Sequence, residues 1–339
     1  MSHYCVHVAY HDDNCDDLLL TAVRPVLAGV AGSYFVRHWQ RGPHLRLNVP
    51  MERYAGRSTD QGTVERLVAE HVGGYLAGHP STAELDPAAL LPLHQSLARM
   101  EQVDGPLLPW YPNNSVQPAD YDDRAAALGG RAAADLLAGF YVATTPALFD
   151  ALAQVRAGAA RLGAALDLII SVAHAFADGG ITGGFVSLRS HAEAFLGEGD
   201  RSRLRRAWDE QYRLRACALQ DRVSAIVAEV DRGTNSWVQT VRPTAQAGQR
   251  LLAAGRLPMS SLRQARGSEF HQALAGNDRW HEQVEPSLAF RSYRLLLNYT
   301  YLQLTRLGVK PVERFMLCHF AANAVEERYG VSAIDLVQS

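Results

Sequence analysis

The chain has 339 residues, of which 47% are hydrophobic and 20% are charged, a composition typical of a soluble globular protein. Its formal net charge is −2, from 33 basic and 35 acidic residues, so overall charge does not favour a nucleic-acid groove. We find no apolar stretch of membrane-spanning length and no secretory signal at the N-terminus. We therefore expect a cytoplasmic protein that binds neither nucleic acid nor membrane.

Motifs for metals and cofactors are missing from the sequence. The histidines do not fall at metal-ligand spacing on one helix face, and no nucleotide-binding or hydrolase signature is present. The glycine-rich run 178–184 follows a helix instead of a strand, which favours a helix end and a turn over a phosphate-binding loop. The cysteines form neither a CxxC pair nor a zinc spacing; they are Cys5, Cys15, Cys217 and Cys318. We therefore expect no metal and no cofactor.

The first 60 residues are expected to be rich in strands. Residues 3–10 alternate like a strand, and a helix is predicted from about Asp12 to Leu27, with Pro25 kinking or shortening it. The next stretch, 33–49, is typical of a β-hairpin, because two alternating runs flank turn-forming residues at 41–43.

The second strand of this hairpin has two chemically different faces. Its apolar residues would point into a core, whereas His44 and Arg46 would point the other way, and Arg37 and His38 lie on the neighbouring strand. A row that combines positive charge with an imidazole is suited to holding a carbonyl or a carboxylate. The solvated outer face of a sheet would show the same pattern.

Beyond residue 60 the hydrophobic pattern is mostly helical. It predicts amphipathic helices over 62–77 and 86–100, a long helix from Thr145–Pro146 to about Ala177, and two last helices over 287–307 and 311–329. Residues 104–123 break this pattern and are predicted to form a loop, either near a functional site or as a simple connector.

These elements predict an α+β fold. N-terminal antiparallel strands would form a sheet that packs against a larger set of helices. No shift in composition marks a boundary, so we expect a single domain over 1–339, with a strand-rich part over 1–60 and a mostly helical part over 61–339.

The predicted helix 287–307 carries two mostly polar columns. Positions 287, 291, 294 and 298 share one side, and positions 292, 295, 299, 303 and 306 share the adjacent one. Tyrosine can donate and recover a proton, and arginine can bind an oxyanion, so this helix would suit an active site. A helix lying partly in solvent would look the same. The residues of interest are Ser287, Arg291, Tyr293, Arg294, Tyr301, Gln303 and Arg306.

Three segments of the chain resemble one family. The stretch Phe-Val-Arg-His-Trp-Gln-Arg-Gly-Pro-His-Leu-Arg-Leu at 35–47 closely resembles a signature of the C-terminal, glutamate-eliminating domain of class I lanthipeptide dehydratases. The stretch Ser-His-Ala-Glu-Ala-Phe at 190–195 resembles a second motif of that domain. Leu-Thr-Arg-Leu-Gly at 304–308, followed by Glu313, is similar to its last pair of helices.

Stand-alone members of this family occur in thiopeptide biosynthesis. Some eliminate glutamate from glutamylated Ser or Thr. Others, the pyridine synthases, join two dehydroalanines by a formal aza-4+2 cycloaddition and then lose water and the leader peptide. Eliminases carry His-Met-His where this sequence has Tyr301-Leu302-Gln303, and Thr305 replaces an asparagine of the family. The missing imidazole implies a pyridine synthase; the alternatives are a glutamate eliminase and a non-catalytic peptide-binding scaffold.

The resemblance implies a substrate and a set of roles. The partner would be a linear precursor peptide that contains thiazoles and dehydroalanines and still carries its leader. Tyr293 would help convert the reacting amide to its imidic-acid form, Ser287 would stabilise developing charge, and His44 would hold a carbonyl or assist loss of water. The loop 104–120 and the arginine-rich face over 201–215 are candidates for binding the leader. The implied substrate-binding residues are Arg37, Arg46, Arg291, Arg294, Tyr301, Gln303 and Arg306.

Overall fold

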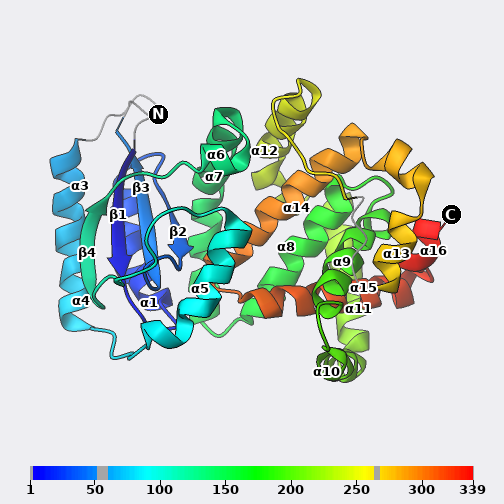
Figure 1. The fold of residues 1–339 in the computed structure, drawn as a ribbon, viewed down its shortest axis with the longest axis horizontal. Coiled ribbons are helices and arrows are strands. Elements are labelled where there is room, and N and C mark those ends of the chain that lie inside the picture. Colours follow the sequence, from blue (N-terminus) through cyan, green and yellow to red (C-terminus); the bar gives the residue numbers. More distant parts are fainter. Residues whose placement is uncertain (1–2, 52–59, 263–267, 339) are drawn as a thin grey trace. The chain divides into compact units, whose positions relative to one another are not determined.

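The computed structural model describes residues 3–51, 60–262 and 268–338 (Figure 1). The chain divides into two compact units, Met1–Gly158 and Ala159–Ser339. The first unit contains the sheet, and the regular elements described in the second unit are helices. The α+β fold with N-terminal antiparallel strands is confirmed, whereas the single domain over 1–339 stays a prediction.

The sheet of the first unit has four strands in the order β2-β3-β1-β4, and each neighbouring pair is antiparallel. The predicted hairpin 33–49 is confirmed as β2 and β3. At its turn, Gly42 has a φ of 91°, and a Cβ there would lie 3.0 Å from the Trp110 ring, so this position requires glycine. The strands are β1 His3–Ala9, β2 Tyr34–His38, β3 His44–Pro50 and β4 Ser115–Ala119.

The fourth strand corrects the prediction of a loop over 104–123. Residues 115–119 form β4, which pairs with β1 and lies at one end of the sheet. The edge position explains how a strand can contain Pro118, because a proline without an N–H is tolerated where one side of the strand needs no hydrogen-bonding partner. The prolines of this stretch had hidden the strand from the sequence pattern.

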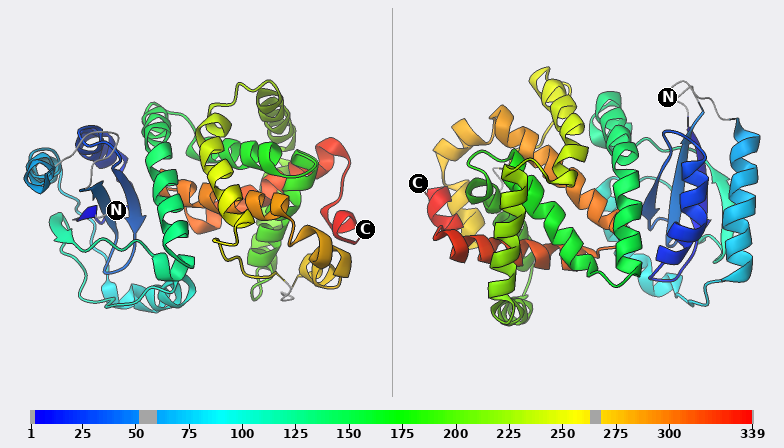
Figure 2. Two further views of the ribbon diagram at one scale, coloured as in Figure 1. Left: turned by 90° about the horizontal axis from the view of Figure 1, so that it is seen from above. Right: turned by 180° about the vertical axis from the view of Figure 1, so that it is seen from behind.

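Helices surround the sheet within the first unit. In Figure 2 the helical segment of residues 16–28 runs alongside the strands. The helical segment continues through Pro25, which occupies the first turn of α2 directly after the π-helical turn η1. The elements are α1 Asp16–Leu18, η1 Leu19–Val23, α2 Arg24–Ala28, α3 Gln61–Leu67, η2 Val68–Gly73, α4 Gly74–Gly78, α5 Pro87–Glu101, α6 Ala125–Leu128 and α7 Arg131–Arg156.

Helix α7 differs from its prediction in both bounds. It spans 26 residues with Pro146 inside it, so the expected helix start at Thr145–Pro146 is wrong. The hydroxyls of Thr144 and Thr145 donate to the carbonyl oxygens of Phe140 and Tyr141, one helical turn back. Pro146 has no N–H for the carbonyl oxygen of Val142, and the two threonine bonds lie immediately before that position.

The same helix is long and apolar enough, by length and composition, to cross a membrane, which the sequence analysis did not anticipate. It contacts β2 and η1, and the ring of its Phe149 lies 5.8 Å from that of Phe35 on β2. Its apolar side chains therefore contribute to the core of the first unit.

The second unit is built around α8, α9, α14 and α15, which contact one another. The glycine-rich run 178–184 follows the end of α8, as predicted, and α9 begins within it at Ile181. A Cβ on Gly184 would lie 2.2 Å from the Ala173 carbonyl oxygen, so α8 and α9 approach at backbone distance. The helices are α8 Arg161–Phe176, α9 Ile181–Leu196, α10 Ser202–Arg213, α11 Ala216–Asp231, α12 Ser236–Ala253, α13 Glu269–Ala275, η3 Trp280–Val284, α14 Leu288–Leu307, α15 Pro311–Tyr329 and α16 Ala333–Gln338.

Candidate active site

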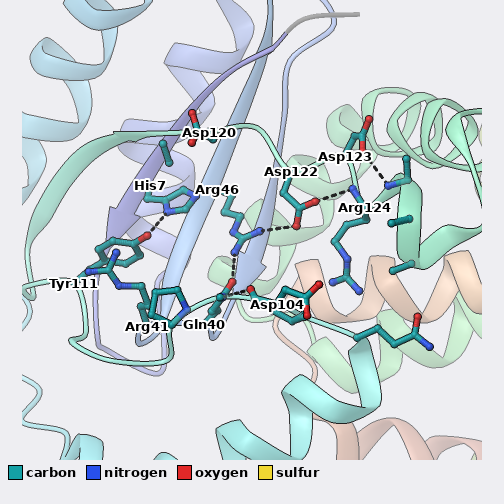
Figure 3. Close-up of a pocket in the computed structure, with 18 residues that line it drawn as sticks. His7, Gln40, Arg41, Arg46, Asp104, Tyr111, Asp120, Asp122, Asp123 and Arg124 are labelled. Carbon is teal, nitrogen blue, oxygen red and sulfur yellow. Dashed lines mark hydrogen bonds and ion pairs between the residues drawn. The ribbon is translucent and has the colours of Figure 1, made fainter.

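A cavity of about 540 Å³ lies in the first unit (Figure 3). It is lined by β1, β3, the turn after β2 and two segments around residues 102–111 and 119–127. The register pairs His7 of β1 with Arg46 of β3, and directly paired residues point to the same face of a sheet. Residues of the segment 104–123, for which a loop near a functional site or a simple connector was expected, line this cavity.

Arg46 is held in the cavity wall by three partners. Its Nε donates to His44 Nε2 at 3.2 Å, and a terminal nitrogen donates to Gln40 Oε1 at 3.1 Å. The other terminal nitrogen lies 3.9 Å from the Asp122 carboxylate. Burial lowers the pKa of Arg46, yet a guanidinium stays charged throughout the physiological range. The result is a fixed positive charge with a defined orientation.

Three imidazoles gather beside this arginine. The ring of His44 lies 4.5 Å from that of His7 and 5.4 Å from that of His38, between centroids. Burial and the guanidiniums of Arg46 and Arg41 lower the pKa of His7 to about 4. Burial and the neighbouring His7 lower the pKa of His44 to about 3, and burial and Arg46 place the pKa of His38 well below its usual value. All three rings are therefore neutral near pH 7.

We expect this cluster to make the protein sensitive to acid. The histidines titrate near pH 6.5 in the unfolded chain and at lower pH in the folded one. Unfolding then takes up protons, so stability is full above about pH 6.5 and is lost toward about pH 4, at about 1.4 kcal/mol per pH unit for each proton. Thermal unfolding measured from pH 7.5 to 4.5 should show a falling Tm. The decline should be shallower in His7→Gln and His44→Gln; equal slopes would contradict this account.

Arg37 does not share this wall, and its predicted role in binding substrate stays a prediction. It pairs with Leu45 in the register, which directs its side chain to the opposite face of the sheet from Arg46. There it donates to Cys15 Sγ at 2.8 Å and to Asp16 Oδ1 at 3.3 Å. Neighbouring residues on a strand alternate between faces, so the side chains of Arg37 and His38 point to opposite sides of the sheet.

In the second unit, the first polar column of α14 has structural contacts. Ser287 is the N-cap, whose Oγ accepts from the Phe290 N–H at 3.2 Å. Arg291 donates to the Leu257 carbonyl oxygen at 3.4 Å, and Arg294 donates to that of Ser260 at 2.8 Å. These bonds tie the segment after α12 to α14. The predicted roles of the three residues with substrate stay predictions.

The remaining residues predicted on α14 are buried within the second unit. The hydroxyl of Tyr301 lies 2.7 Å from His191 Nδ1 and 3.3 Å from Cys318 Sγ. Arg306 donates to Gln303 Oε1 at 2.9 Å, and both side chains are buried. Their predicted roles in binding substrate also stay predictions. His191 belongs to the family-like motif at 190–195. Nothing in the sequence indicated that this histidine contacts Tyr301.

Tyr293 is also enclosed by its own unit. It is 2% exposed, and its hydroxyl donates to the Gly184 carbonyl oxygen at 2.7 Å. Burial raises the pKa of this phenol far above its usual value. The role of Tyr293 as a proton donor stays a prediction, and this geometry argues for a structural role.

We therefore expect Tyr293→Phe to lower the free energy of unfolding by about 1 to 2 kcal/mol, because the Gly184 carbonyl loses its donor. Turnover of the peptide should stay within about threefold of the parent. Denaturant unfolding and a single-turnover assay measure the two effects. A loss of activity of about 100-fold with unchanged stability would instead establish the catalytic role.

Sequence reasoning missed four residues that shape the cavity. The alternation of residues 3–10 could have placed His7 on a strand, but only the register shows that it faces Arg46. Gln40 accepts from Arg46 and donates to the Asp104 carbonyl oxygen at 2.9 Å, which links the hairpin to the loop. Tyr111 and Asp122 come from that loop region. No group of three metal-binding side chains is found in the part of the chain that the structure describes.

Comparison with known proteins places this architecture in a family. The family model for the C-terminal domain of lantibiotic biosynthesis dehydratases matches residues 4–325. The chain belongs to this family, and the resemblance expected from the sequence is confirmed.

Two solved structures are similar over nearly the full chain. One is the pyridine synthase TbtD from thiomuracin biosynthesis, which is 35% identical, with a TM-score of 0.79 over 98% of this chain and 100% of that one. The other, TsrL, is 22% identical, with a TM-score of 0.74 over 99% of this chain and 97% of that one, and supports the fold alone. A comparison with curated protein sequences found no match.

Proposed function

We propose that this chain is a thiopeptide pyridine synthase. The observation that carries the proposal is the full-length similarity to TbtD at 35% identity. The sequence supports the same proposal, because Tyr301 and Gln303 stand where the eliminases carry histidines, which argues against glutamate elimination. The substrate would be a linear precursor peptide with thiazoles, two dehydroalanines and its leader, and we place the reaction in the cytoplasm.

The reaction forms two carbon–carbon bonds. The imidic-acid form of the amide and the alkene of one dehydroalanine make an azadiene, C=N–C=C, and its two terminal carbons bond to the two carbons of the second alkene. Loss of water, and of the leader peptide as an amide, then leaves an aromatic pyridine at the centre of a macrocycle. Most of the acceleration would come from holding the two alkenes close together and aligned, because this turns an improbable encounter along a flexible chain into a local one.

The cavity of the first unit offers the chemistry for one part of this task. Arg46, fixed by Gln40, His44 and Asp122, can hydrogen-bond a peptide carbonyl and stabilise negative charge that develops on its oxygen. The neutral ring of His44 supports the guanidinium without adding repulsion, since its pKa lies near 3. We therefore retain Arg46 as a substrate-binding residue and assign His44 the role of orienting it.

Parallel incubations test the function directly. With a leader-bearing peptide that contains two dehydroalanines, a pyridine synthase releases the leader fragment and produces a new pyridine absorbance, and mass spectrometry detects both products. With a glutamylated peptide, release of glutamate would identify an eliminase instead. Binding of either peptide without any change in mass would identify a scaffold.

A further inference from the structure

One polar atom in the cavity has no partner within the described residues. His7 is 6% exposed and lines the cavity, yet its Nε2 makes no hydrogen bond. The register places Gln117 of β4 directly opposite His7, and the side-chain nitrogen of Gln117 is likewise buried without a partner. Leaving a buried polar group unpaired is costly, so the unpaired Nε2 of His7 in the cavity wall indicates that a molecule from outside the chain supplies its hydrogen-bond partner.

The other ring nitrogen of His7 is engaged. The Tyr111 hydroxyl lies 3.2 Å from His7 Nδ1, as the dashed line in Figure 3 marks. Tyr111 is itself fixed, because its N–H donates to the Arg41 carbonyl oxygen at 2.9 Å and the Arg41 guanidinium lies 4.3 Å from its ring centroid. When the phenol donates to Nδ1, the single proton of the neutral imidazole resides on Nε2. In that arrangement the unpaired Nε2 of His7 is a hydrogen-bond donor.

The charge of the cavity decides which acceptor fits. Its lining includes four carboxylates, of Asp104, Asp120, Asp122 and Asp123, and three guanidiniums, of Arg41, Arg46 and Arg124. The lining therefore has no excess of positive charge that would attract a carboxylate from water. Burying a carboxylate here would cost desolvation free energy that the lining does not repay. A neutral carbonyl oxygen avoids this desolvation cost and accepts hydrogen bonds from both a guanidinium and an imidazole N–H.

We propose that His7 is a substrate-binding residue whose Nε2–H donates to a backbone carbonyl oxygen of the precursor peptide, with Tyr111 as the positioning residue that fixes its tautomer. This inference rests on the proposed function for the identity of the peptide. It adds a contact from β1, next to Arg46 of β3, so that two adjacent strands would hold neighbouring polar groups of one bound peptide.

The tautomer is tested without any turnover. In protein labelled with ¹⁵N-histidine, His7 should show the Nε2–H form, and its signal is assigned by its loss in His7→Ala. Tyr111→Phe should shift the signal toward a mixture of both tautomers. Addition of the leader-bearing peptide should move the Nε2 resonance of the parent protein. If saturating peptide leaves the His7 resonance unchanged, water alone accepts the hydrogen bond from Nε2–H, and the proposal is overturned.

Affinity and kinetics supply the second readout. A fluorescently labelled linear peptide should bind about tenfold more weakly to His7→Phe than to the parent, and about threefold more weakly to Tyr111→Phe, with KM rising and kcat nearly constant. His79→Gln replaces an exposed histidine of the same unit and should change neither value. Thermal unfolding confirms that each variant folds.

The two proposals fail differently. If the parent binds the peptide but forms no pyridine, the proposed function is wrong, and the binding and tautomer data still test His7. If the parent forms pyridine while His7→Phe keeps the parent's affinity and KM within twofold, the function stands and the role of His7 is refuted.

Discussion

Replacing Arg46 with glutamine is expected to lower the rate of pyridine formation by at least about 100-fold. The guanidinium is 12% exposed, bonded to His44 and Gln40, and close to the Asp122 carboxylate. Such a prearranged donor stabilises developing charge at no further cost of reorganisation, and removing one donor of this kind typically costs two to three orders of magnitude in rate. Conversion of the two-dehydroalanine peptide, followed by mass spectrometry, measures the loss.

Two controls separate chemistry from folding. Arg46→Lys keeps the charge but loses the planar set of donors, so it should recover only part of the rate. Arg66→Gln removes an exposed arginine that pairs with Glu70 at 3.4 Å and should leave both rate and Tm unchanged. A folded Arg46→Gln protein with the parent's rate would remove Arg46 from the mechanism.

A single added methyl group at position 184 should have a large effect on stability. The Cβ of Gly184→Ala would lie 2.2 Å from the Ala173 carbonyl oxygen, so α8 and α9 must separate before the chain can accommodate it. The shift would also disturb the bond from the Tyr293 hydroxyl to the Gly184 carbonyl oxygen. We expect a loss of about 3 to 5 kcal/mol in the free energy of unfolding, enough to deplete soluble protein.

The matched control is Gly139→Ala in α7, where a Cβ would meet no atom within 4 Å. Alanine is the better helix former, so this variant should be as stable as the parent or up to about 1 kcal/mol more stable. Denaturant unfolding of both variants measures the difference. A Gly184→Ala protein as stable as Gly139→Ala would show that α8 and α9 are not packed at backbone distance.

Elements with local signals were predictable from the sequence. The hairpin followed from alternation on both sides of Arg41–Pro43, and α14 was placed correctly because its N-cap, Ser287, and its terminal Gly308 are both local features. For the same reason, the face of β3 that carries His44 and Arg46 was assigned correctly.

Features that depend on distant partners were not predictable. The strand β4 exists because residues 115–119 pair with β1, more than 100 positions earlier, and its prolines had concealed it. The register that sets His7 beside Arg46 is also non-local. On α14, helical periodicity placed Tyr293 correctly along the helix but could not show that Gly184 would accept its hydrogen bond.

The position of β1 in the middle of the sheet also sets the order in which the chain can fold. This strand leaves the ribosome before both of its partners, and one of them, β4, ends at Ala119. The second edge of β1 stays unpaired until β4 has been synthesised. Pairing across so long a loop is slow, because the chain loses conformational entropy on closing the loop before the stabilising contacts form. Nascent chains that end before residue 115 would thus expose an unpaired strand edge that could capture a neighbouring chain.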